Sequence, residues 1–110
     1  MDRATAERLA PRVKVMKAIA HPTRLYIVEE LARGERCVHE LTDMVGADIS
    51  TVSKHLALLK SVGIVKDERR GNEVYYSLAL RCVLGFFECV EEVLAHGSSE
   101  CSAPSCRARA

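Results

Sequence analysis

The 110-residue chain has no tryptophan, and aromatic residues make up only 5% of it. Such a composition disfavours the aromatic platforms of carbohydrate-binding sites and of grooves for single-stranded nucleic acid. The longest uncharged apolar stretch, Cys82–Phe87, is far shorter than the ~20 residues that a membrane helix needs. Charged residues near the N-terminus also interrupt any apolar segment of the kind that signal peptides carry. We therefore expect a single domain-sized chain in the cytoplasm.

The formal net charge is only +1, so the total charge does not indicate a nucleic-acid partner. Any DNA-binding surface on this chain must be local and modest. Dimerisation would double its phosphate contacts and so compensate for the low charge.

Apolar spacing and helix breakers predict four helices in the first part of the chain. The first runs from about 6–10 to 20, the second over 22–33 and the third over 38–45. The fourth starts at a cap provided by Asp48 or Ser50 and ends at Gly63. Its core stripe is Ile49, Val52, Leu56 and Leu59.

The pattern then changes to strands. The runs 64–66 and 74–78 flank Arg69–Asn72, where Gly71 and Asn72 tolerate a tight turn, so we expect a two-stranded hairpin packed on the helices. A last helix is expected over about 79–95, with Cys82, Phe86 and Cys89 along one stripe. Its apolar face is too wide for a terminal helix that packs only on its own subunit, which favours pairing with a second copy. Residues 97–110 are expected to form a flexible, cysteine-containing tail.

The third and fourth helices, joined by a tight turn at residues 46–48, form a predicted helix-turn-helix. Small hydroxyls and lysine on the outward face of the fourth helix suit insertion into the major groove of DNA. The hairpin tip adds groups that can reach an adjacent groove or the backbone. The candidate DNA-binding residues are Ser50, Thr51, Ser53, Lys54, His55, Lys60, Arg69, Arg70 and Asn72.

Several runs together resemble the ArsR/SmtB family: 18–25 (AIAHPTRL), 37–41 (CVHEL), 50–60 (STVSKHLALLK), 63–65 (GIV), 70–72 (RGN) and 74–78 (VYYSL). The resemblance covers about residues 13–95. It implies a mainly α winged helix-turn-helix domain over 1–96 that forms a homodimer through its first and last helices. It also implies a repressor that leaves its operator DNA when an effector binds. The effectors of this family are mostly metal or metalloid ions, and some members sense thiol oxidation or sulfide.

The resemblance also implies where an ion would bind. The family's cysteine motif at the start of the third helix is only partly present, because Cys37 and Val38 are followed by His39 and then by Thr42. Of the positions that hold zinc or nickel on the last helix in other members, only Cys82 and His96 carry ligating side chains. The remaining cysteines favour a thiol-rich site made by Cys101 and Cys106 and completed by Cys89 or Cys37.

Thiolate ligands select soft ions, so we expect As(III), Sb(III) or another thiophilic ion such as Cd²⁺ as the effector. A disulfide switch between the tail cysteines is the alternative within the same fold. A thiol enzyme is disfavoured because the chain has no Cys-x-x-Cys motif, no Gly-rich phosphate loop and no room for a cofactor domain. A helical dimer that binds only protein is disfavoured by the hydroxyl-and-lysine face.

Overall fold

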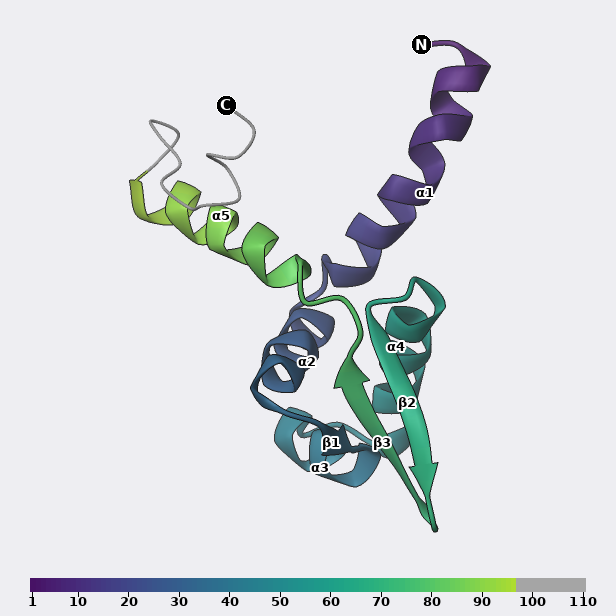
Figure 1. Cartoon of the computed structure of the whole chain (residues 1–110), viewed down its shortest axis with the longest axis vertical. Coiled ribbons are helices and arrows are strands. Elements are labelled where there is room, and N and C mark those ends of the chain that lie inside the picture. The colour runs from purple at the N-terminus through teal and green to yellow at the C-terminus, as the bar shows by residue number, and fades with distance from the viewer. Residues whose placement is uncertain (97–110) are drawn as a thin grey trace. The chain divides into compact units, whose positions relative to one another are not determined.

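In the computed structural model, two helices, a short strand, two more helices, a β-hairpin and a last helix follow one another (Figure 1). The structure describes residues 1–96. The chain divides into two units: the first is Met1–Ala79, and the second begins at Leu80. The first unit contains α1 (Arg3–Ile19), α2 (Pro22–Arg33), β1 (Arg36–Cys37), α3 (Val38–Val45), α4 (Ile49–Ser61), β2 (Val65–Arg70) and β3 (Glu73–Leu78). The second contains α5 (Val83–His96).

Local capping explains where the helices begin and end. The imidazole of His21 accepts a hydrogen bond from the backbone N–H of Thr23, and Pro22 occupies the first turn of α2. Asp48 caps α4 by accepting from the N–H of Thr51 at 2.8 Å. Gly46, with φ of 78°, ends α3 in the left-handed conformation that glycine adopts without a steric penalty. The bounds predicted for α2 and α3 are confirmed.

The first helix is longer than its sequence pattern indicates. α1 begins at Arg3, because Asp2 accepts a hydrogen bond from the N–H of Thr5 at 2.8 Å and caps the helix there. Pro11 lies inside α1 rather than in its first turn. Only Ala18 and Ile19 are buried in this helix, and the apolar side chains of Val13, Val15 and Met16 are exposed.

The core of the first unit is formed by apolar side chains from all seven of its elements and the loop after α4, with Ala18 and Ile19 contributed by α1 and Cys37 by β1. Its largest fully buried members are Ile27, Val28 and Leu31 of α2, Leu41 of α3, Val52, Leu56 and Leu59 of α4, Ile64, and Val65 of β2, with Leu78 of β3 nearly so. This confirms three of the four residues predicted for the α4 stripe. Ile49 is the exception at 44% exposed, because it is the first residue of the helix and lies beyond the core.

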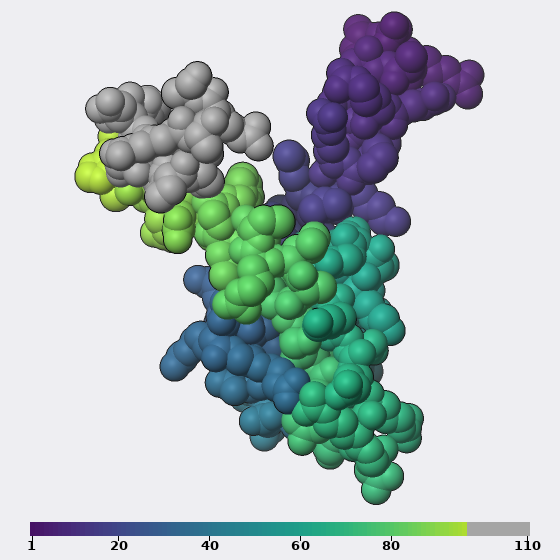
Figure 2. Space-filling model, in the orientation of Figure 1, coloured from purple at the N-terminus to yellow at the C-terminus, as the bar shows by residue number. Residues whose placement is uncertain are grey.

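The sheet has three strands rather than the two that the sequence predicts. β1 pairs antiparallel with β3, with Arg36 opposite Tyr76 and Cys37 opposite Tyr75, and β3 pairs antiparallel with β2. A two-residue strand leaves no periodicity to detect, so only the tertiary pairing defines β1. The tip of the β2–β3 hairpin, at Gly71 and Asn72, projects beyond the helices around it (Figure 2).

The helix of the second unit begins later than predicted. α5 starts at Val83 instead of about 79, so Cys82 lies before the helix and is exposed, and it does not share a helical stripe with Cys89. None of the residues of α5 is buried, and Phe86, Val93 and Leu94 are 49%, 52% and 73% exposed. Among residues 1–96, no helix combines the length and the hydropathy that crossing a membrane requires.

Candidate nucleic-acid interface

The exposed face of α4 carries the side chains that the sequence analysis selected for DNA contact. Ser50, Thr51, Ser53 and Lys54 are all exposed, while the opposite side of the helix is held in the core. Ser50 donates its hydroxyl hydrogen to Asp48 at 2.8 Å. Hydrogen bonds from Thr51 and Ser50 lower the pKa of Asp48, with a smaller contribution from the charge of Lys54. The first turn of α4 is therefore capped, and it presents hydroxyls and an ammonium group to solvent.

The two lysines of α4 have different surroundings. The Nζ of Lys60 lies 2.9 Å from a carboxylate oxygen of Asp67 on β2, and this hydrogen bond raises the pKa of Lys60. Lys54 makes no ion pair with any of the residues that the structure describes. The positive charge of Lys54 is therefore available to a phosphate, whereas that of Lys60 is already partly neutralised.

The hairpin tip shows a similar contrast between its two arginines. Arg70 pairs with Glu35 and Glu68 and lies over the ring of Tyr75, 4.7 Å from its centroid. Hydrogen bonds to Glu35, and then to Glu68, raise the pKa of Arg70. Arg69 is exposed, and its side chain donates to the carbonyl oxygen of Gly71 at 3.3 Å and makes no ion pair with the residues that the structure describes. Together with the exposed Asn72, Arg69 is the better placed of the two to contact DNA.

His55, predicted at the edge of the outward face, points toward the start of α2 instead. It is half-buried, its ring centroid lies 4.8 Å from that of His21, and its Nδ1 lies 3.2 Å from a guanidinium nitrogen of Arg24. Arginine can only donate, so Nδ1 of His55 accepts and the ring is neutral with its proton on Nε2. Burial, followed by the charges of His21 and Arg24, lowers the pKa of His55.

Arg24 links three elements, a role that the sequence analysis did not identify. Besides His55 of α4, its guanidinium donates to the carbonyl oxygens of Lys17 and Ala18 at the end of α1. The orientation of α4 is thus tied to the α1–α2 junction. The only sequence signal for this link was that Arg24 lies two residues after Pro22, in the run that resembles the ArsR/SmtB family.

The cysteines predicted as ligands lie in different parts of the chain. Cys37 is 9% exposed at the start of α3, and Cys89 is half-buried on α5 in the second unit. Cys101 and Cys106 lie outside the described residues. The backbone hydrogen bond from Glu40 lowers the pKa of the Cys37 thiol, but burial and the carboxylates of Glu40 and Glu73 outweigh it, so this pKa is raised.

His39, beside Cys37, has a partner far away in the sequence. Its Nδ1 lies 2.9 Å from a carboxylate oxygen of Glu73 at the start of β3, and this contact raises the pKa of His39. The sequence analysis did not select Glu73, because nothing local connects it with a residue 34 positions earlier.

A short helix, a glycine turn, a second helix with a polar outward face and a β-hairpin together define a winged helix-turn-helix DNA-binding protein. The family model described as "Bacterial regulatory protein, arsR family" matches residues 21–67, which span α2 to the beginning of β2. The chain belongs to the ArsR family.

Relatives and solved structures agree with this assignment. The HTH-type transcriptional repressor SmtB of Mycobacterium tuberculosis is 46% identical over 66 residues, which are 60% of this chain and 49% of that protein. A cadmium resistance transcriptional regulatory protein CadC homolog of Staphylococcus aureus is 42% identical over 66 residues, 59% of this chain and 54% of that protein. This chain therefore spans about half the length of these relatives.

A solution structure from Mycobacterium bovis, described as a homodimeric winged helix-turn-helix DNA-binding domain, matches with a TM-score of 0.74 and 34% identity. The match covers 91% of this chain and 96% of that one. These findings confirm the predicted winged helix-turn-helix fold and the predicted family, whose matched members are described as transcriptional regulators or repressors.

Proposed function

We propose that this chain is a homodimeric repressor that binds a palindromic operator in double-stranded DNA and is released by a thiophilic ion, with As(III) as the leading candidate. The observation that carries the DNA-binding part is the exposed face of α4, where hydroxyls surround Lys54, which makes no ion pair with any of residues 1–96. We assign Ser50, Thr51, Ser53 and Lys54 to the major groove. Arg69 and Asn72 reach the adjacent backbone or minor groove.

The remaining candidates take lesser roles in this proposal. Lys60 and Arg70 contact phosphates only if their ion pairs with Asp67 and with Glu35 and Glu68 open. His55 acts through its contact with Arg24, which holds α4 in place, rather than by touching a base.

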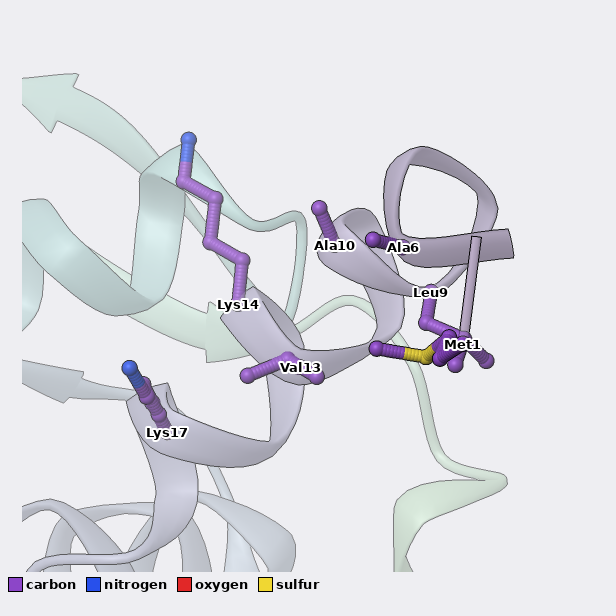
Figure 3. A pocket seen from close by; sticks show the side chains of 7 residues that line it. All are labelled: Met1, Ala6, Leu9, Ala10, Val13, Lys14 and Lys17. Atoms are coloured by element: carbon purple, nitrogen blue, oxygen red, sulfur yellow. The ribbon is translucent and has the colours of Figure 1, made fainter. Parts of the chain in front are cut away.

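Dimerisation is supported by apolar surfaces that each unit leaves exposed. On α1, Leu9, Val13 and neighbouring alanines line a shallow groove flanked by Lys14 and Lys17 (Figure 3). On α5, Phe86, Val90, Val93 and Leu94 are exposed. A second copy of the chain can cover both surfaces, and removal of this apolar area from water supplies the driving force. The M. bovis domain of the same fold is described as homodimeric.

The effector is proposed from the chemistry of the cysteines. Sulfur ligands prefer soft ions such as As(III), Sb(III) and Cd²⁺, and the name of the CadC homolog links a relative of this chain to cadmium resistance. We assign Cys101 and Cys106 to the site, with Cys89 or Cys37 as the third ligand. Oxidation of the tail cysteines to a disulfide is the competing trigger.

The proposed release follows from linkage. An ion that binds one dimer geometry better than another shifts the population toward that geometry. Two recognition helices must match half-sites about one turn of DNA apart, so a small change in their spacing weakens operator binding.

A mobility-shift titration tests the effector assignment. As(III), Sb(III), Cd²⁺ and an oxidant are each added to the complex of the protein with its own operator, for the wild type and for Cys101→Ser/Cys106→Ser. We expect the variant to fold and bind operator like the wild type but to resist release by the ions. Full wild-type release of the variant by every agent would refute the tail site. Loss of the oxidant response alone would favour the disulfide switch.

A further inference from the structure

The strands β1 and β3 and the helix α3 adjoin in the first unit (Figure 1), and three side chains of different chemistry lie close together there. Each of Cys37, His39 and Glu73 offers one ligand atom, and these atoms all lie within 4.8 Å of one another. Of the residues that the structure describes, these form the one group of three or more such side chains close enough to share an ion.

The fold brings these residues together from positions far apart in the chain. Cys37 pairs across the sheet with Tyr75, two residues after Glu73, so the start of β3 lies beside the start of α3. The backbone N–H of Cys37 donates to Glu40 at 3.0 Å, which fixes the first turn of α3 and the direction in which Cys37 and His39 leave it. His39 and Glu73 are already in contact at 2.9 Å.

We propose that Cys37, His39 and Glu73 form a binding site for a borderline divalent ion, Zn²⁺ being the natural occupant, that joins the helix-turn-helix to the wing. A thiolate, an imidazole and a carboxylate are the donors that Zn²⁺ takes, and water fills its fourth position. The mixed donors of this site differ from those of the thiol-rich site proposed above. Because Cys37 is a ligand here, Cys89 is the residue that completes the thiol-rich site.

The charges balance when the ion is bound. A thiolate and a carboxylate carry two negative charges, the imidazole is neutral, and the ion carries two positive charges. Binding releases the thiol proton of Cys37, because the thiolate is the form that ligates, so binding strengthens as the pH rises.

The rearrangement that binding needs is small. In a tetrahedral zinc site, the distance between two ligand atoms is about 1 Å shorter than the widest distance between ligand atoms in this cluster. The side chains of His39 and Glu73 are 61% and 38% exposed, so they can turn without disturbing the core. The ion pair that they give up is exposed to water and contributes little to stability.

Cobalt substitution tests the site directly, because a thiolate bound to Co²⁺ produces a near-ultraviolet charge-transfer band. The first variant replaces Cys82, Cys89, Cys101 and Cys106 with Ser and keeps Cys37 as its single thiol. We expect this variant to show the band on titration with Co²⁺ under reducing conditions, and Zn²⁺ to abolish the band by displacing the cobalt. Adding Cys37→Ser removes the band.

The second and third ligands are tested in the same background. Glu73→Gln and His39→Gln each remove one ligand, and we expect Co²⁺ affinity to fall by about tenfold or more. Glu68→Gln, on the same hairpin but outside the cluster, is the matched control and leaves the affinity unchanged. If the four-serine variant fails to fold, Glu73→Gln, His39→Gln and Glu68→Gln are compared in the wild-type chain. The part of the cobalt charge-transfer band that Glu73→Gln removes there reports this site.

Absence of the band in a folded Cys37-only variant would overturn the proposal, as would equal Co²⁺ affinities for Glu73→Gln and Glu68→Gln. Neither result bears on the thiophilic effector, because that hypothesis is tested by As(III) release from operator in a chain whose tail cysteines are changed. The two proposals can therefore fail separately.

Discussion

Replacement of Lys54 by alanine tests the recognition face most sharply. Lys54 is exposed on α4 and has no ion pair among residues 1–96, so its ammonium group is available to DNA. Loss of one base or phosphate contact costs about 1–3 kcal/mol. A dimer carries the change twice, so operator binding should weaken by about 2–6 kcal/mol, roughly 30-fold to 10⁴-fold. The slope of log K against log salt should become shallower by about 2, one for each lost phosphate contact.

The matched control is Lys60→Ala on the same helix. Its ammonium group is held by Asp67 at 2.9 Å, so a phosphate gains little from it, and we expect affinity and salt slope close to those of the wild type. Both variants are measured by fluorescence anisotropy with operator DNA at several salt concentrations, after circular dichroism has shown that they are folded. Wild-type affinity and slope for Lys54→Ala would refute the proposed face. Equal losses of operator affinity for both variants would show that Lys60 contributes to DNA binding despite its ion pair with Asp67.

Three further predictions concern stability and assembly. Leu56→Ala deletes a side chain that is 0% exposed in the core, so urea unfolding should show a loss of about 2–5 kcal/mol; a smaller loss would mean that the cavity collapses. The pKa of His55 is lowered in the folded chain, so the unfolded chain takes up a proton first and stability should fall as the pH drops below the ordinary value of 6.5. His55→Asn keeps an acceptor for Arg24 but does not titrate, and its stability should depend less on pH over that range; an unchanged pH profile would contradict this role. Phe86→Glu places a charge on the exposed apolar face of α5 and should give monomers in light scattering, whereas an intact soluble dimer would exclude this face from the interface.

The helix ends that could be predicted are those marked by a capping or helix-ending residue within about one helical turn in the sequence. Pro22 and Gly34 mark the two ends of α2, Gly46 ends α3, and Asp48 caps α4, each through contacts with near neighbours in the sequence. The polar face of α4 was likewise visible in the sequence, because opposite sides of a helix separate by periodicity alone. The start of α5 was placed too early because an apolar pattern does not show where a helix begins without a cap.

The sequence by itself therefore determined the class of fold, the recognition helix and the hairpin that follows it. Tertiary structure decided which of the candidate side chains are available. Lys60 is neutralised by Asp67, Arg70 by Glu35, and His55 is turned toward Arg24, none of which a pattern search detects. The same holds for the cluster at Cys37, since Glu73 reaches it only through the pairing of β1 with β3. The physical reason is that helix caps and periodicity act between neighbours in the chain, whereas charge pairing depends on which distant segments the hydrophobic core brings together.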